Sequence, residues 1–463
     1  MKLTILGGGG VRMPAFVRAV LAGRPGTFSE ICLFEPDPGR RGTICRLAVE
    51  IAAALGHPDV IQVSGDAAGA FTGADYVFSA IRVGGDRGRI IDEEVALRRG
   101  IVGQETTGPG GGAMALRTIP VVLSYCDLLA QVAPDAVLIN FTNPAGLITQ
   151  AISTQGKVRV AGVCDTPGGT VEHLAHFLGA ADVSVAGSYA GLNHLGWVCS
   201  LRDGGGRERI GELLDRFEEL QAADHRFASF DPALVRRAGA IPTEYVYYFY
   251  DPGRYVADIR RAGATRGQDV LRLNEELMAG LGKAFADGGV QDAWAVYDTL
   301  LGVRRDTYMR ADMQGDNGQG AARARRLVRP PAGIAAAQIG GYEGLALRVI
   351  DGLAGIAPGE VIVNTRAGAS LGLDPADVVE VPARVDPGGL TPLPLPGLPR
   401  AALGLIMQVK EYERGIVQAA MTGDAGLAAV ALAEHPLVPG ITAARELIAD
   451  YREQHGPDLA YLT

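Results

Sequence analysis

Four side chains that could bind a cation or move a proton lie next to apolar runs of the sequence. Asn143 stands in FTNPAG behind the run AVLIN, Cys164 and Asp165 stand in VAGVCDTP, and His194 stands in AGLNHLGW. A cysteine and a histidine with open positions around them suit a soft to borderline divalent metal. A lone cysteine and a lone histidine are also common core residues. The pair therefore predicts a metal site or two buried side chains, and spacing alone leaves both open.

A phenol and guanidinium groups could complete such a site. The stretch IPTEYVYYFY holds four tyrosines, of which Tyr245 is the first, and at least two are expected in the core. A phenol close to a metal and to a cation such as Arg266, in GATRGQ, has its pKa lowered and can act as a base. Arg82 and Arg89, in AIRVGGDRGRIIDEE, could fix an anionic substrate group or be solvated helix charges.

The elements that must position these residues alternate between strand and helix over the first 165 residues. Apolar, β-rich runs such as KLTIL, EICLFEP, VIQVS and AVLIN are separated by helical stretches such as PAFVRAVLAG. This pattern predicts an α/β fold with an N-terminal Rossmann-like, doubly wound parallel sheet, as in lactate and malate dehydrogenases. Ligands of such sheets bind at the carboxyl ends of the strands. Asn143, Cys164 and Asp165 are expected at those ends.

The character of the chain changes near residue 181. The stretch DVSVAGSYAGLNHLGWVCSL alternates like antiparallel strands, and long helices mix with strands such as EVIVNT and VVEVPARV further on. We predict a dinucleotide-binding domain over 1–180 and a mixed α+β domain over 181–463 that carries substrate, metal and oligomer contacts. The loop GQETTGPGGGAMA is predicted to hold too much glycine for regular structure.

A glycine loop follows the first predicted strand. LTILGGGGVRMP places Gly7, Gly8, Gly9 and Gly10 between a strand and a helix, where bare backbone N–H groups can approach a pyrophosphate. Glu35 ends the second strand, where a carboxylate can bind a ribose diol, and its charge favours NAD over NADP. Arg12 occupies the third glycine position of the usual fingerprint, so a plain tight turn is the alternative.

Composition narrows the function classes. The 463 residues carry a net charge of -9 and a pI near 5.4, which disfavours nucleic acid as a partner. The N-terminal apolar run is too short for a signal peptide, and no 18 apolar residues run uninterrupted, so we expect a cytoplasmic protein with no membrane partner. Five scattered cysteines do not form a disulfide framework.

Several ordered strings together resemble family 4 of the glycoside hydrolases. They are GGGG, IRVGG with RIIDEE, GIVGQET, ALRTIPV, NFTNPAG, GVCDTP, GLNHLGW and IPTEYVYYF, and VVEVPARVD follows near the C-terminus. The strings span about residues 3 to 386, which is most of the chain. The resemblance implies NAD and a divalent metal, Mn²⁺ first, as cofactors, and a homodimer or homotetramer. It also implies hydrolysis by C3 oxidation, elimination, water addition and re-reduction.

The resemblance assigns roles to the residues around the metal. Cys164 and His194 would hold the cation together with the substrate's 2- and 3-oxygens. Tyr245 would be the base, with Arg266 beside it. Asp165 would be the acid or a hydroxyl-binding group.

It also assigns substrate contacts and a substrate class. Asn143 and Arg89 would bind the sugar, Arg89 near its phosphate, and Glu105 of GQET would lie close to metal and sugar. We predict 6-phospho-β-glucosides as substrates. The sequence departs from the phospho-sugar members, which usually have Ser-Ser-Tyr-Thr where this chain has Gly-Val-Arg-Met at 10–13, so the need for the 6-phosphate is open.

Alternatives remain at this point. The Asp after the cysteine resembles the α-type members, whereas RTIPV and IPTEYVYYF resemble the β-type, so a 6-phospho-α-glucosidase is one alternative. A non-phosphorylated α-glycosidase of the same family is another. An NAD-dependent 2-hydroxy acid dehydrogenase and a nucleotide-binding redox sensor share the predicted nucleotide fold.

Overall fold

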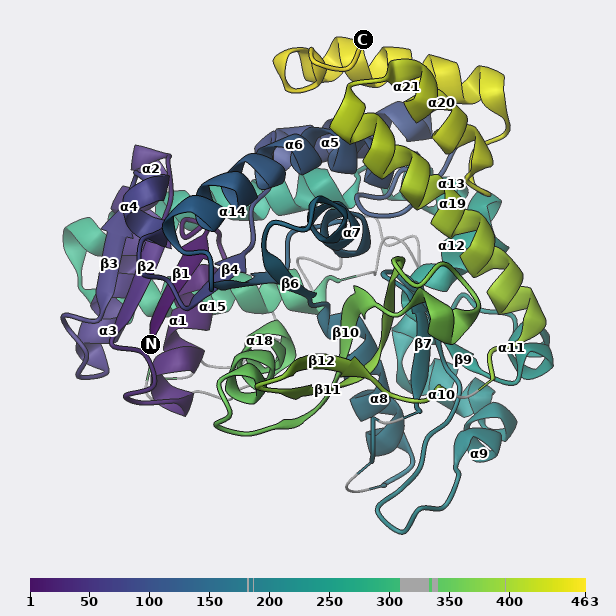
Figure 1. The fold of residues 1–463 in the computed structure, drawn as a ribbon, viewed down its shortest axis with the longest axis horizontal. Helices are drawn as coiled ribbons and strands as arrows, with labels where there is room; N and C mark the ends of the chain where they lie inside the picture. Colours follow the sequence, from purple (N-terminus) through teal and green to yellow (C-terminus); the bar gives the residue numbers. More distant parts are fainter. Residues whose placement is uncertain (181–182, 186, 309–332, 335–339, 396) are drawn as a thin grey trace.

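The chain folds around one 12-stranded sheet, in which the first six strands in sequence are parallel (Figure 1). The computed structural model describes residues 1–180, 183–185, 187–308, 333–334, 340–395 and 397–463. The parallel strands follow the order β3-β2-β1-β4-β5-β6, the doubly wound order of dinucleotide-binding folds, which confirms the predicted fold class. Their bounds are β1 Lys2–Leu6, β2 Glu30–Phe34, β3 Ile61–Ser64, β4 Tyr76–Ser79, β5 Val137–Asn140 and β6 Arg159–Gly162.

Strands from the second half of the chain extend the same sheet. They are β7 Tyr189–Leu192, β8 Leu195–Val198, β9 Ile241–Pro242, β10 Gly359–Arg366, β11 Val378–Asp386 and β12 Gly389–Pro392. β10 continues the sheet antiparallel to β6. β7 and β8 are antiparallel, as expected for this stretch, and Asn193 and His194 lie in the turn between them. Because strands from both sides of residue 180 share one sheet, the predicted domain division stays a prediction.

Two helical layers cover the parallel strands. One layer contains α1 Met13–Gly23, α3 Arg46–Ala54 and α18 Gly341–Leu353, and the other contains α4 Ala67–Phe71, α6 Gly108–Val132 and α7 Ala145–Gln155. In β2, Ile31 and Leu33 join the first layer's apolar cluster, whereas Cys32 and Phe34 join the second. Alternation of side chains along a strand explains this division. Burial on both faces explains why these strands form nearly continuous apolar runs.

The remaining helices surround this core. They are α2 Pro38–Arg40, α5 Gly85–Arg98, α8 Asp165–Phe177, α9 Ile210–Asp215, α10 Phe217–Ala223, α11 Pro232–Ala238, α12 Tyr247–Tyr250, α13 Pro252–Ala262, α14 Arg266–Asp287, α15 Val290–Asp306, α19 Arg400–Thr422, α20 Ala425–Glu434 and α21 Ile441–His455. A π-helical turn, Arg41–Cys45, precedes α3, and 3-10 turns span His225–Phe227, Glu244–Val246, Gly368–Leu371 and Gly456–Leu459. α14 and α15 pack on α3 through a third apolar cluster. In Figure 1 the C-terminal helices lie over α5 and α6, and α21 contacts both.

The prediction that GQETTGPGGGAMA lacks regular structure is wrong from Gly108 onward, because α6 begins there. A Cβ on Gly110 would lie 2.3 Å from the Gln104 carbonyl oxygen, and one on Gly111 would lie 2.4 Å from that of Thr106. These glycines let the helix pack directly against the loop before it. α6 is also long and apolar enough to cross a membrane by length and composition. In this fold it packs against α5, α7 and α19.

Candidate active site

The loop after β1 runs close beside β2 at the carboxyl edge of the sheet. The N–H groups of Gly7 and Gly8 donate to the Phe34 carbonyl oxygen over 3.1 and 2.8 Å. Gly7 has a φ of 95°, a conformation that favours glycine, and a Cβ on Gly8 would lie 2.7 Å from Leu33 Cβ. Both positions therefore require glycine. α1 follows, with a proline in its first turn.

Glu35 comes directly after β2 and faces the same loop. Its carboxylate accepts hydrogen bonds from the N–H groups of Gly9, at 3.1 Å, and Asp37, at 3.0 Å. Gly7, Gly10 and Glu35 line a cavity of ≈ 1990 Å³, which we call the cavity. It is larger than the ~300–1,000 Å³ of most small-molecule sites, so it has room for a dinucleotide beside a sugar.

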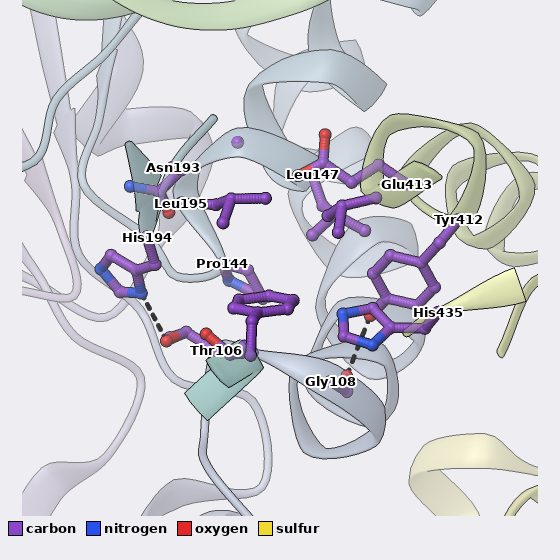
Figure 2. Close-up of a pocket in the computed structure, with 14 residues that line it drawn as sticks. Thr106, Gly108, Pro144, Leu147, Asn193, His194, Leu195, Tyr412, Glu413 and His435 are labelled. Atoms are coloured by element: carbon purple, nitrogen blue, oxygen red, sulfur yellow. Dashed lines mark hydrogen bonds between the residues drawn. The ribbon is translucent and has the colours of Figure 1, made fainter. Parts of the chain in front are cut away.

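Cys164 and His194 reach the cavity from different elements. Cys164 follows β6 and immediately precedes α8, and its side chain is buried. His194 occupies the β7–β8 turn with a φ of 62°, which is rare for a residue other than glycine. Its Nδ1 lies 2.5 Å from Thr106 Oγ1, and a dashed line in Figure 2 marks this hydrogen bond. Nε2 is the ring nitrogen left for a ligand.

The chemistry of this donor pair suits a divalent cation. Burial lowers the pKa of His194 to about 4, although the Glu105 carboxylate opposes this, so the imidazole is neutral near pH 7. Burial raises the pKa of Cys164 well above its ordinary value, and the charges of Glu380 and Asp165 raise it further. A bound cation would stabilise the thiolate. Within the described parts of the chain, no three His, Cys, Asp or Glu side chains converge as a metal-binding group, so these two residues would leave further coordination positions open.

Tyr245 stacks on the His194 ring, with centroids 3.8 Å apart and planes at 11°. Its hydroxyl lies 2.5 Å from that of Tyr308, which in turn contacts Glu244 Oε1 at 3.4 Å. Burial, together with the charges of Glu244 and Cys164, raises the pKa of Tyr245 well above its ordinary value. All of these side chains line the cavity. A phenol thus lies directly beside the imidazole of the candidate metal site.

Glu105 bridges two arginines at the cavity wall. Its carboxylate contacts Arg82 Nη1 at 2.6 Å and Arg89 Nη1 at 3.0 Å. Burial acts to raise the pKa of Glu105, but the two guanidinium groups outweigh it and lower the pKa to about 2. Arg82 and Glu105 line the cavity. Arg89 is only 5% exposed, lies behind them, and also contacts Glu93 at 2.7 Å.

Further arginines line the cavity, among them Arg12 before α1, Arg266 at the start of α14, and Arg304 in α15. Arg266 donates to Thr307 Oγ1 at 3.0 Å and to the Arg304 carbonyl oxygen at 2.7 Å. Burial lowers the pKa of Arg304 to about 9, and the charges of Arg12 and Arg266 contribute. We call Arg12, Arg82, Arg266 and Arg304 the arginine cluster. Its concentrated positive charge favours an anionic ligand.

The cavity collects most of the residues that the sequence singles out. Those that line it are Gly7, Gly10, Glu35, Glu105, Asn143, Cys164, Asp165, His194, Tyr245 and Arg266. Gly8 and Gly9 lie behind the loop surface, packed against Leu33 and Glu35, and Arg89 lies behind Glu105. Sequence reasoning missed several lining residues, among them Glu244, Arg304 and Tyr308. Glu244 could have been found, because it precedes Tyr245 in IPTEYVYYF. The other two have no local motif.

Comparison with known proteins identifies the family of the chain. The family model described as "Family 4 glycosyl hydrolase" matches residues 2–180, and that of the "Family 4 glycosyl hydrolase C-terminal domain" matches residues 189–438. The chain is 27% identical over 469 residues to the probable 6-phospho-beta-glucosidase of Bacillus subtilis (strain 168), covering 98% of this chain and 96% of the relative.

Two solved structures share the fold over nearly the whole chain. The 6-phospho-beta-glucosidase of Thermotoga maritima with NAD and glucose-6-phosphate has a TM-score of 0.78 and 24% identity, covering 98% of each chain. A 6-phospho-alpha-glucosidase from gut microorganisms in complex with NAD and Mn²⁺ has a TM-score of 0.80 and 20% identity, covering 99% of this chain and 98% of that one. Because the C-terminal family model alone matches more than half of the chain and the N-terminal model matches the rest of the site, this protein belongs to family 4 of the glycosyl hydrolases.

Proposed function

We propose that the protein hydrolyses 6-phospho-β-glucosides and requires NAD⁺ and a divalent cation. The first candidate for the cation is Mn²⁺. The observation that carries this proposal is that the glycine loop, Cys164, His194 and Tyr245 all line the same cavity. A glycosidase that used two carboxylates alone would need neither a nucleotide loop nor a thiol and imidazole pair. Relatives described as 6-phospho-glucosidases bind NAD, Mn²⁺ or glucose-6-phosphate, which supports the same ligands here.

The nucleotide would bind at the glycine loop. Gly7 and Gly10 offer bare backbone at the N-terminal end of α1, which suits a pyrophosphate. Glu35 would accept hydrogen bonds from a ribose diol, and its charge disfavours a 2′-phosphate. These features support NAD rather than NADP.

The cation would bind at Cys164 Sγ and His194 Nε2, with open positions for substrate oxygens. When bound, NAD⁺ would supply reversible hydride transfer and the cation would supply a Lewis acid beside the sugar. Tyr245 would take the proton from C2 of the sugar, as the base nearest to the imidazole. The positive charge of a cation there would favour the phenolate and oppose the effect of burial on the Tyr245 pKa. Asp165 and Asn143 line the same cavity. Asn143 would bind sugar hydroxyls, and Asp165 would bind a hydroxyl or protonate the leaving oxygen.

The arginine cluster supports a phosphorylated substrate. Arg12 stands where phospho-sugar members carry hydroxyl residues, and it lines the cavity with its pKa raised, since Tyr342 and Asp165 outweigh the effect of burial. A guanidinium can bind a phosphate bidentately. Arg89, which was predicted near the phosphate, would instead act through Glu105 and Arg82. The structure therefore favours the cluster as the phosphate site.

The test is release of nitrophenol from nitrophenyl 6-phospho-β-glucoside and 6-phospho-α-glucoside, with NAD⁺, Mn²⁺ and a reductant. We expect turnover of the β-anomer, loss of activity with a chelator, and little activity on the unphosphorylated analogues. If the α-anomer is the preferred substrate, the protein is a 6-phospho-α-glucosidase instead, like the second solved structure described above. Absence of turnover on all four substrates would contradict the proposed function.

A further inference from the structure

The loop before α6 contacts the His194 ring at Nδ1, the nitrogen that would not bind the metal. Thr106 Oγ1 lies 2.5 Å from His194 Nδ1, and Figure 2 shows the two side chains meeting there. Thr106 Oγ1 also donates to Gln104 Oε1 over 2.8 Å. All three side chains are buried, so water does not compete for these bonds.

The orientation of the Gln104 amide is fixed by its surroundings. The same Oε1 atom accepts hydrogen bonds from the backbone N–H groups of Thr106 and Thr107, each over 2.7 Å. Two backbone donors can only be satisfied by the oxygen of the amide, so the alternative amide flip is excluded. The atom that Thr106 Oγ1 faces is therefore an acceptor.

The acceptor at Gln104 sets the direction of the hydrogen bond between Thr106 and His194. A threonine hydroxyl has one hydrogen, and Gln104 takes it. Thr106 Oγ1 therefore presents a lone pair to His194, and Nδ1 must carry the proton of the neutral imidazole. Nε2 is then unprotonated, which is the form that binds a metal.

We propose that Gln104 and Thr106 are positioning residues that fix the tautomer and the orientation of His194, so that Nε2 is held ready for the divalent cation. This inference rests on the proposed function, because it assumes a cation at Cys164 and His194. Their role matters because His194 lies in a turn with an unusual backbone conformation, and the Tyr245 ring stacked on its face does not decide which ring nitrogen carries the proton. Outer-shell partners of this kind commonly change metal affinity about 10- to 100-fold.

The experiment is titration of the full-length, metal-free protein with Mn²⁺, followed by calorimetry, in the presence of NAD⁺ and glucose 6-phosphate. The variants are Thr106→Val, which removes the hydroxyl at nearly constant volume, and Thr106→Ser, which retains it. Thr107→Val is the matched control, since among the described residues the Thr107 hydroxyl has no hydrogen-bond partner. Thermal melting checks that each variant is folded.

We expect Thr106→Val to weaken Mn²⁺ binding about 10- to 100-fold, with Thr106→Ser and Thr107→Val close to the parent. The Mn²⁺ concentration for half-maximal activity should rise for Thr106→Val, while kcat at saturating Mn²⁺ stays close to that of the parent. With Co²⁺ as a spectroscopic substitute, Thr106→Val should alter the visible absorption bands.

Cys164→Ser separates this inference from the proposed function. If the parent binds Mn²⁺, Cys164→Ser does not, and Thr106→Val binds as tightly as the parent, the positioning role is overturned and the metal site stands. If the parent and Cys164→Ser behave alike, the metal site itself is wrong and the positioning role falls with it.

Discussion

A single phenol, Tyr245, carries the proton-transfer step of the proposed chemistry. It stacks on His194 and lines the cavity, so a phenol lies beside the candidate metal site. We expect Tyr245→Phe to lower kcat by about 100-fold or more, because general bases typically contribute 10²–10⁴-fold. The measurement is steady-state hydrolysis of nitrophenyl 6-phospho-β-glucoside. Folding should be unaffected, since the ring and its stacking remain.

The matched control is Tyr247→Phe. Tyr247 belongs to the same segment and is buried, but it does not line the cavity. Unchanged kcat is expected for this variant. Equal kcat for Tyr245→Phe and the parent would remove Tyr245 from the mechanism.

At the same scale, the sequence predicts residue types better than it predicts their partners. Cys164, His194 and Tyr245 line the same cavity, because each sits next to a strand or turn that reaches the sheet edge, whereas their roles stay a prediction. Arg89 differs, since a long side chain on a helix can turn toward a buried carboxylate that no local pattern reveals. Tyr308 has no sequence motif, and only the structure, which places it after α15 and beside the Tyr245 hydroxyl, reveals it.

Among the elements, the β1–α1 loop depends on the absence of a side chain at Gly8. A Cβ there would lie 2.7 Å from Leu33 Cβ, in the middle of a buried strand that cannot move away. We expect Gly8→Ala to displace the loop, to destabilise the fold by about 1–3 kcal/mol as overpacking does, and to weaken NAD⁺ binding. Urea unfolding and fluorescence titration with NADH measure the two effects.

Gly42→Ala is the control for this prediction. Gly42 lies in the helical segment nearby, and a Cβ there meets no atom within 4 Å. It should leave NADH affinity unchanged. If Gly8→Ala binds NADH as tightly as Gly42→Ala does, the glycine loop does not hold the nucleotide.

The sequence predicts the parallel strands and the β7–β8 hairpin well, because periodicity and turn residues are local signals. The prediction from sequence is wrong at the start of α6. Glycines there signal a loop when helix propensity is considered alone, but close approach to Gln104 and Thr106 makes glycine necessary within the helix. Tertiary packing, which propensity does not contain, decides that element.

For the whole molecule, buried histidines link stability to pH. His435 is fully enclosed, and burial lowers its pKa to about 3 from an ordinary value near 6.5. Below pH 6.5 the unfolded chain takes up a proton that the folded protein refuses, so stability is lost as pH falls. His435→Asn keeps an acceptor for the Leu437 N–H but does not titrate. When the pH falls from 7.5 to 5, the parent should lose about 2 kcal/mol more of its free energy of unfolding than the variant loses.

Urea unfolding at several pH values measures that shift. His194 has a lowered pKa as well, but it is present in both proteins and cancels in the comparison. A difference that does not change with pH would mean that His435 takes up its proton in the folded protein as readily as in the unfolded chain.

The central claim is that this glycosidase breaks the glycosidic bond after removing the proton at C2, with NAD⁺ and a cation bound in one cavity. The most direct test is hydrolysis of nitrophenyl 6-phospho-β-glucoside in deuterated water, with NMR of the glucose 6-phosphate formed early in the reaction. We predict deuterium at C2 of the product. Product that carries only hydrogen at C2, at a normal rate of hydrolysis, would contradict the account.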